Sequence, residues 1–167
     1  MEQNVIDASG LLAISTRLQR LSDQIRKDGV LIYKAFGIDF QPKWFPVLYT
    51  LHKKSAMSVV LLSEEIGYAH PSTISLLKEL EREKLIRSKK DKTDTRKRLV
   101  ELTEKGETLL STMKPVWDVI IQATAEITNT QNNLMKAIVE VEEGLRQKGF
   151  LERAQAYFPD KTIKTDL

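Results

Sequence analysis

The sequence predicts a mainly α-helical fold in which a compact lobe of short helices and one β-hairpin lies between long terminal helices. Three observations favour this class. Apolar residues recur at helical spacing along most of the 167-residue chain. Two short helical stretches are joined by a tight turn. A charged run follows them and is bounded by two short segments typical of strands.

The first long helix is predicted over Leu11–Phe36. Its apolar residues are spaced by four, three and four positions, and Gly37 stands where a helix stops. The stripe is narrow, as in a helix that packs against another helix. A short helix follows Pro42, with apolar residues at positions 44, 47, 48 and 51. The stripe of the first helix comprises Ile14, Leu18, Leu21 and Ile25.

A helix-turn-helix pattern follows. Ser58 is placed to cap its first helix and Gly67 to end it. Pro71 suits the first turn of the second helix, Pro71–Glu83, because its missing N–H costs little there. Two helices of a bundle would give a similar pattern. The second helix is predicted to bury Ile74, Leu77 and Leu80 and to expose Ser72, Thr73, Ser75, Lys78 and Arg82.

A basic hairpin follows directly, with strands at Ile86–Ser88 and Leu99–Leu102 and its tip at Lys89–Arg98. Residues 82–98 hold nine Lys or Arg and three Asp or Glu, a net charge of +6, whereas the rest of the chain has a net charge of −3. Such localised charge attracts polyanions to one face, although many charged runs are only solvated surface. A helix-turn-helix with a basic hairpin is the pattern of a winged helix, whose second helix enters the DNA major groove.

The remaining chain is predicted to form two long helices. Thr103 is placed to cap the first, which runs to about residue 127 and should bend at Pro115. After a polar break, the second helix is predicted over Leu134–Tyr157, with its apolar residues again on one stripe.

The order of these elements, together with the run DTRKRLVELTEKG, resembles the MarR (multiple antibiotic resistance regulator) family of transcription factors. The stretch PSTISLLKELEREKLI resembles the family's recognition helix. The resemblance covers nearly the whole chain as one domain, with residues 42–102 as the winged helix-turn-helix lobe and residues 11–36 and 103–167 as dimerisation helices. It implies a homodimeric, ligand-responsive repressor that binds double-stranded DNA, with Leu11–Ile25 and Leu134–Tyr157 in the dimer interface.

The resemblance also implies which residues contact DNA. Arg96 would reach the minor groove and Asp94 would hold the wing. Leu76 stands where many relatives carry a polar base reader, which indicates either a poorer direct readout of bases or apolar contact with thymine methyl groups. As an alternative function, an exposed Leu76 would suit a winged helix that docks a protein without sequence-specific DNA binding. Lys84 replaces a common turn glycine and would need a left-handed backbone. The full predicted DNA-binding set is Pro71, Ser72, Thr73, Ser75, Lys78, Lys89, Lys90, Asp94, Arg96 and Lys97.

Aromatic residues cluster where the two parts of a MarR-like protein would meet, a region in which relatives bind small aromatic or anionic effectors. Ordinary core packing explains the same residues, because aromatic side chains dominate most cores. An effector pocket at this place would be lined by Tyr33, Trp44, Phe45 and Trp117.

Other chemistry finds little support in the sequence. The chain has no cysteine, and His52 and His70 are too isolated to suggest a metal site. No phosphate loop, dinucleotide motif or nucleophile elbow occurs. We therefore expect no metal, no cofactor and no enzymatic activity. No apolar run reaches the roughly 18 residues of a membrane span, and the N-terminus lacks the basic start of a secretion signal, which together favour the cytoplasm.

Overall fold

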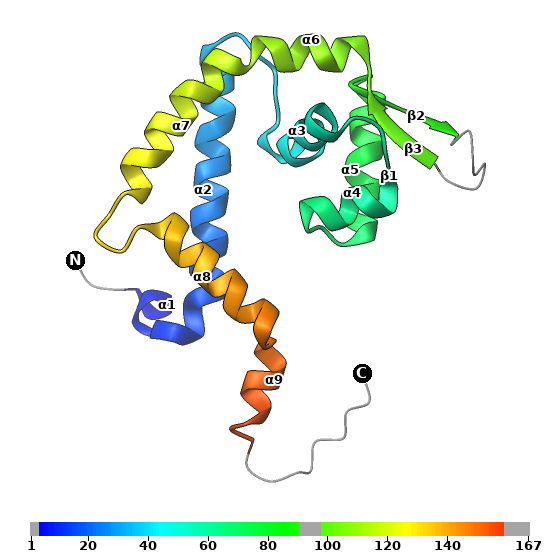
Figure 1. The fold of residues 1–167 in the computed structure, drawn as a ribbon. Coiled ribbons are helices and arrows are strands. Elements are labelled where there is room, and N and C mark those ends of the chain that lie inside the picture. The colour runs from blue at the N-terminus through cyan, green and yellow to red at the C-terminus, as the bar shows by residue number, and fades with distance from the viewer. Residues whose placement is uncertain (1–3, 91–97, 159–167) are drawn as a thin grey trace. The chain divides into compact units, whose positions relative to one another are not determined.

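The computed structural model describes residues 4–90 and 98–158 (Figure 1). The chain divides into two compact units, Met1–Ile120 and Ile121–Leu167. The first unit contains the helix-turn-helix and the hairpin, so the candidate site can be described within it alone. The lobe boundaries predicted from the sequence stay a prediction.

The first unit begins with a short helix that the sequence did not predict, α1 (Val5–Ala8), followed by the long helix α2 (Ile14–Ala35). Residues 10–13 form a 3-10 turn that starts at Gly10 with φ of +61°, so α2 begins later than predicted. Gly37 follows the end of α2 with φ of +71°, as the sequence predicts. Tyr33 is the one buried residue of α2, and the predicted apolar stripe remains about half exposed.

Three short helices follow and form the helix-turn-helix with its supporting helix: α3 (Phe45–Lys54), α4 (Val59–Ile66) and α5 (His70–Arg82). The Ser58 hydroxyl accepts a hydrogen bond from the Leu61 N–H, which confirms the predicted cap of α4. Gly67 ends α4 in the left-handed region, with φ of +68°. Local sequence chemistry therefore sets both ends of α4.

The predicted hairpin is confirmed as part of a three-stranded antiparallel sheet with the order β1-β3-β2 (Figure 1). Its register pairs Ile86 with Leu102 and Lys90 with Arg98. The strands are longer than predicted, so Lys89, Lys90 and Arg98 belong to strands and not to the tip. The sequence missed β1, because two residues are too few to show alternation. The strands are β1 (Met57–Ser58), β2 (Ile86–Lys90) and β3 (Arg98–Leu102).

The chain then leaves the sheet through α6 (Glu104–Thr112) and α7 (Lys114–Thr128). The Thr103 hydroxyl accepts from the Gly106 N–H at 3.1 Å, which confirms the predicted cap of α6. The expected bend at Pro115 is a break, because α6 ends at Thr112 and Pro115 lies in the first turn of α7, where its missing N–H is tolerated.

In the second unit, the predicted single helix over 134–157 is wrong. It is divided into α8 (Leu134–Gln147) and α9 (Phe150–Gln155), with Lys148 extended between them. The Arg153 guanidinium donates to the carbonyl oxygens of Gly144, at 2.6 Å, and Lys148, at 2.9 Å. The Gly144 carbonyl oxygen also accepts from the Lys148 N–H at 3.1 Å, so Arg153 adds side-chain bonds that link α9 to the end of α8.

One hydrophobic core holds the winged-helix part together. Helices α3, α4 and α5, both strands of the hairpin and the start of α7 contribute to it. Burying a side chain of this kind stabilises a fold by about 1.5–3 kcal/mol, so the core fixes α5 beside the base of the hairpin. Its members include Val47, Leu48, Leu62, Leu77, Leu80, Ile86, Val100, Met113 and Val116.

Candidate nucleic-acid interface

The outward face of α5 is a row of polar and basic side chains. At about 100° per residue, positions 71, 75, 78 and 82 follow one line that lies opposite the buried positions. Two further residues flank this line, one on each side. Hydroxyl donors and positive charges are thereby presented over about three turns, which suits contacts with phosphates and base edges. The exposed residues of this face are Pro71, Ser72, Ile74, Ser75, Lys78 and Arg82.

Two residues of α5 lie elsewhere than the sequence predicts. Thr73, predicted to contact DNA, is fully buried, and its hydroxyl donates to the Ala69 carbonyl oxygen at 3.3 Å. Ile74, predicted for the core, is 36% exposed. The buried positions 73, 76, 77 and 80 follow the helical pattern i, i+3, i+4, i+7. A threonine can occupy such a position because it bonds back to its own helix.

Leu76 is also buried, at 8% exposure. It therefore does not lie on the outward face of α5 but in the core. The protein-docking alternative depended on an exposed Leu76 and loses its support. The large apolar side chain on the outward face of α5 is that of Ile74.

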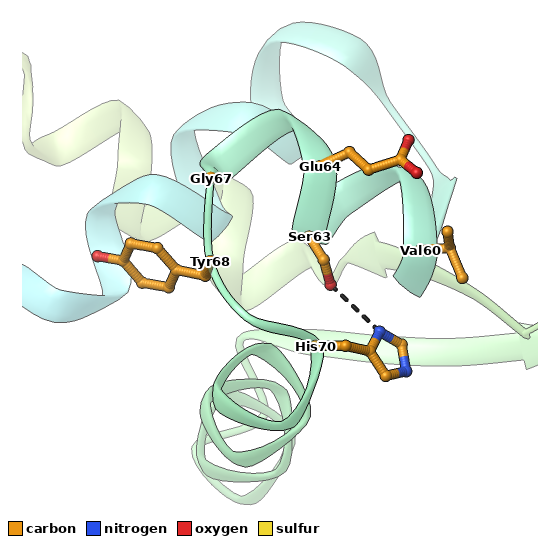
Figure 2. Close-up of a pocket in the computed structure, with 6 residues that line it drawn as sticks. All are labelled: Val60, Ser63, Glu64, Gly67, Tyr68 and His70. Atoms are coloured by element: carbon orange, nitrogen blue, oxygen red, sulfur yellow. Dashed lines mark hydrogen bonds between the residues drawn. The ribbon is translucent and has the colours of Figure 1, made fainter. Parts of the chain in front are cut away.

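The turn between α4 and α5 carries a shallow hollow of about 510 Å³ (Figure 2). Ser63 and His70 point toward each other across it, with 3.4 Å between Oγ and Nδ1. The Ser63 hydroxyl donates to the Val59 carbonyl oxygen at 2.9 Å. The α5 N-terminus is thus tied to α4 through side chains. The hollow is lined by Val60, Ser63, Glu64, Gly67, Tyr68 and His70.

The outer face of the hairpin carries a small charge cluster. Glu101 on β3 accepts from Arg87, at 2.7 Å, and from Lys89, both on β2. The hydrogen bonds from Lys89 and Arg87 lower the pKa of Glu101. These bonds hold the side chains of Arg87 and Lys89 along the hairpin. The negative charge of Glu101 offsets part of their positive charge. The predicted contacts Asp94, Arg96 and Lys97 lie outside the described residues.

The inner face of the hairpin meets α5. Ser88 and Arg98 both donate to Glu81, and Lys90 is paired with Arg98 in the register. Lys90 is exposed. The sequence did not indicate Glu81, because its partners come from two different strands and become neighbours only when the hairpin folds back along α5.

The end of α5 is anchored by the start of α6. The Thr103 N–H donates to the Leu85 carbonyl oxygen at 3.0 Å, and the Thr103 hydroxyl donates to that of Lys84 at 2.7 Å. The Lys105 ammonium donates to the Glu83 carbonyl oxygen at 2.8 Å. The run Leu102-Thr103-Glu104-Lys105-Gly106 therefore fixes the turn between α5 and the hairpin.

That turn confirms the backbone expected at Lys84, whose φ is +59°. The Lys84 N–H donates to the Glu81 carbonyl oxygen and the Leu85 N–H to that of Leu80, the bonding pattern that favours glycine at the left-handed position. Gly67 occupies the corresponding position after α4. The residue that takes a left-handed backbone after the helix is thus glycine after α4 and lysine after α5.

We expect Lys84→Gly to raise the free energy of unfolding by about 0.5–1 kcal/mol, because glycine adopts a positive φ without steric cost. Urea unfolding monitored by circular dichroism measures the change. Lys84→Ala serves as the control, since it removes the charge but keeps a side chain at positive φ, and it should bring no gain. Equal stabilisation by both variants would contradict the backbone explanation.

The other flank of α5 is tied to the segment before α3. Glu79 accepts from the Lys43 ammonium and from the Trp44 indole N–H, each at 2.8 Å. The hydrogen bond from Lys43 lowers the pKa of Glu79, and the bond from Trp44 acts in the same direction. An open hollow of about 600 Å³ lies beside this contact. It is lined by Arg26, Lys43, Gly67, Tyr68, Ala69, Ser72, Ser75, Leu76 and Glu79.

The four residues predicted for an effector pocket all lie in the first unit. Tyr33 and Trp44 belong to the core, and the Trp117 indole N–H donates to the Tyr33 hydroxyl at 3.1 Å. Phe45 meets Trp117 edge to face, with ring centroids 5.8 Å apart. Neither of the hollows beside α4 and α5 is lined by any of these four residues. The effector site stays a prediction.

Two further observations concern metals and membranes. Within residues 4–90 and 98–158, no group of His, Asp and Glu is arranged to hold a metal ion. Over the same part of the chain, no helix has the length and apolar character needed to cross a bilayer.

The helix-turn-helix, the hairpin and the flanking helices together form a winged-helix fold, as the sequence predicts. No protein-family model matches the chain, and no curated protein matches it. The similarity is therefore to solved structures.

The chain is similar to the transcriptional repressor CouR bound to a 23-mer DNA duplex, at 19% identity and a TM-score of 0.67, over 87% of this chain and 99% of CouR. It is similar to the transcriptional regulator MOSR of M. tuberculosis in complex with DNA, at 17% identity and a TM-score of 0.68, over 80% of this chain and 96% of MOSR. BpsR of Bordetella bronchiseptica, whose DNA binding is regulated by 6-hydroxynicotinic acid, shows 24% identity and a TM-score of 0.56, over 78% of this chain and 98% of BpsR. At these identities, the comparisons establish the shared fold.

Proposed function

We propose that this chain is a MarR-type transcriptional regulator that binds double-stranded DNA in a sequence-specific manner as a homodimer. It acts in the cytoplasm as a repressor. The observation that carries the proposal is the outward face of α5, where Ser75, Lys78 and Arg82 are aligned and exposed beside a basic hairpin. The two elements offer base-edge and backbone contacts from one lobe.

The charge distribution supports the same conclusion. The net charge of +6 over residues 82–98 coincides with the end of α5 and the hairpin, whereas the rest of the chain is negative. A DNA phosphate backbone would be attracted to this part of the molecule and repelled elsewhere. Similar folds in CouR and MOSR are bound to DNA.

Exposed apolar stripes support a homodimer. On α2, Ile14 is 55% exposed and Leu18 49% exposed, and α8 and α9 bury no residue. An exposed apolar stripe of this kind is usually buried against another protein surface, such as a second copy of the chain. A two-fold dimer would place two copies of α5 in successive major grooves and bind a pseudo-palindromic site with half-sites about 10 bp apart.

A small aromatic or anionic effector would weaken DNA binding by favouring a spacing of the two reading helices that no longer fits DNA. The region around Tyr33, Trp44, Phe45 and Trp117 is where we place it. The DNA binding of the similar protein BpsR responds to 6-hydroxynicotinic acid. Titration with phenolic and aromatic acids should change tryptophan fluorescence and DNA affinity together. No change in either would remove the effector from the proposal.

A salt series on DNA binding tests the proposed function. If roughly six phosphates are neutralised per dimer, the logarithm of the binding constant should fall against the logarithm of salt concentration with a slope of about −5. Lys78→Ala and Arg96→Ala should each weaken binding on all sequences and reduce the slope by about 1 per lost phosphate contact. Lys114→Ala, at the start of α7, is the matched control. Salt-independent binding would contradict the proposal.

We expect Ile74 to recognise a thymine methyl group. Replacing the contacted thymine by uracil removes that methyl and should weaken binding of the wild-type protein by about fourfold per half-site, the equivalent of one buried methyl group. Ile74→Ala should lose most of this discrimination, because the shorter side chain no longer reaches the methyl group. A uracil scan in which the two proteins respond alike would contradict this role.

A further inference from the structure

We propose that Glu81 is a positioning residue that holds the wing hairpin against the reading helix in the geometry required for DNA, without contacting DNA itself. The inference rests on the proposed function and assigns a role to an acidic residue at a surface that otherwise attracts a polyanion.

The geometry joins three elements at one carboxylate oxygen. Glu81 Oε1 on α5 accepts from Ser88 Oγ on β2 and from Arg98 Nη2 on β3, each at 2.5 Å. Ser88 is paired with Val100, whose side chain is buried, so the face of the hairpin that carries Ser88 is the face toward the core. Glu81 on α5 is therefore hydrogen-bonded to both strands of the hairpin.

The contacts of Glu81 lie on the part of the hairpin that extends beyond the hydrophobic core. The hydrophobic core holds the base of the hairpin through Ile86 and Val100. Beyond them the core ends, because Ser88 is half-buried while Lys90 and Arg98 are exposed. The bond to Arg98 lies at the last residue pair that the structure describes before the tip. Glu81 therefore restrains the hairpin where packing no longer does.

The carboxylate is suited to this role. Burial alone would raise the pKa of Glu81, but hydrogen bonds from Ser88 and Arg98 outweigh it and the pKa is lowered. The group is therefore charged at neutral pH, and its bond to the Arg98 guanidinium is charge-assisted. The Glu81 side chain is 27% exposed, so the bond is partly shielded from water.

The inference predicts the sign of a mutational effect. An acidic side chain that merely lies near bound DNA repels phosphates, so removing its charge should tighten binding. An acidic side chain that positions the wing should weaken binding when it is removed, despite the same change in net charge. The two roles are therefore distinguishable by direction and not only by size.

The test compares Glu81→Ala with Glu83→Ala in DNA titrations of the full chain. Glu83 follows α5 and its carboxylate contacts only Arg82 among the residues described, at 3.8 Å. We expect Glu81→Ala to weaken binding about tenfold, or about 1.4 kcal/mol, and Glu83→Ala to leave it equal or tighter. Glu81→Gln, which keeps an acceptor for Ser88 but loses the charge, should lie between wild type and Glu81→Ala.

A second measurement needs no DNA. In Glu81→Ala, backbone amides of β2 and β3 should exchange with solvent about tenfold faster, while those in the middle of α5 remain unchanged. Ser88→Ala should add little to Glu81→Ala in either assay, because both remove the same contact. If the wild type binds no DNA, the proposed function fails and amide exchange still decides whether Glu81 restrains the wing. Binding by Glu81→Ala that equals or exceeds the wild type, or unchanged exchange, would overturn the inference.

Discussion

Replacing Gly106 by alanine is expected to lower the free energy of unfolding by about 3 kcal/mol or more, at the destabilising end of single substitutions. A Cβ atom at this position would lie 2.2 Å from the carbonyl oxygen of Leu85 and 3.3 Å from the Cδ2 atom of Leu102. The first of these neighbours is backbone, so it cannot move aside by changing a side-chain rotamer.

The close approach has a structural cause. The start of α6 lies on the turn that leaves α5, where Thr103 bonds to the carbonyl groups of both Lys84 and Leu85. Room for a methyl group requires α6 to move away from this turn and break these bonds. The wing begins at Ile86, so the displacement should also reduce DNA affinity.

Thermal unfolding measures the effect, and a loss of this size corresponds to a melting temperature lower by roughly 6–12 °C for a chain of this length. Gly149→Ala is the control, because nothing lies within 4 Å of a Cβ atom there and its φ of −60° suits any residue. A Gly106→Ala protein as stable as the Gly149→Ala protein would show that α6 can move away from the turn after α5 without cost, which would contradict this explanation.

Leu18→Glu is expected to abolish the dimer and, with it, to lower affinity for a palindromic duplex by a factor on the order of 100 or more, since one half-site then binds alone. Leu18 lies in the middle of the apolar stripe on α2 and is 49% exposed in the single chain. A carboxylate there would be buried without a partner in the dimer.

Analytical ultracentrifugation provides the measurement, with DNA titration beside it. Thr16→Glu adds the same charge on the opposite side of α2, because a step of two residues along a helix rotates the side chain by about 200°, and it should remain dimeric. Persistence of the dimer in Leu18→Glu would place the interface elsewhere. A monomer that keeps full DNA affinity would contradict the two-fold binding mode.

The ends of the elements were predictable where the signal is local. Ser58 and Thr103 cap helices through hydroxyl groups, and Gly67 and Lys84 take positive φ at helix ends, because each requirement involves only a few neighbouring residues. The division between α8 and α9 was missed, although Gly149 marked it. The apolar stripe over residues 134–157 continues across Gly149, so it predicted one unbroken helix.

The candidate site was less predictable, because it depends on tertiary packing. The polarity of Thr73 indicated exposure and the size of Ile74 indicated burial. In the structure Thr73 is buried and Ile74 is exposed, because the core lies on the side of α5 that carries Thr73. The carboxylates of Glu79 and Glu81 tie α5 to segments distant in the sequence, so no spacing along the chain could indicate them. The serine and basic positions of the outward face were predicted correctly as exposed, because they follow the helical period.

Selection from a random pool of double-stranded DNA shows whether two copies of the α5 face and its wing bind one duplex. We expect enrichment of a pseudo-palindrome with half-sites about 10 bp apart, with a preferred thymine that Ile74→Ala no longer selects. A pool that shows no enrichment, or that yields a single asymmetric half-site, would contradict this expectation.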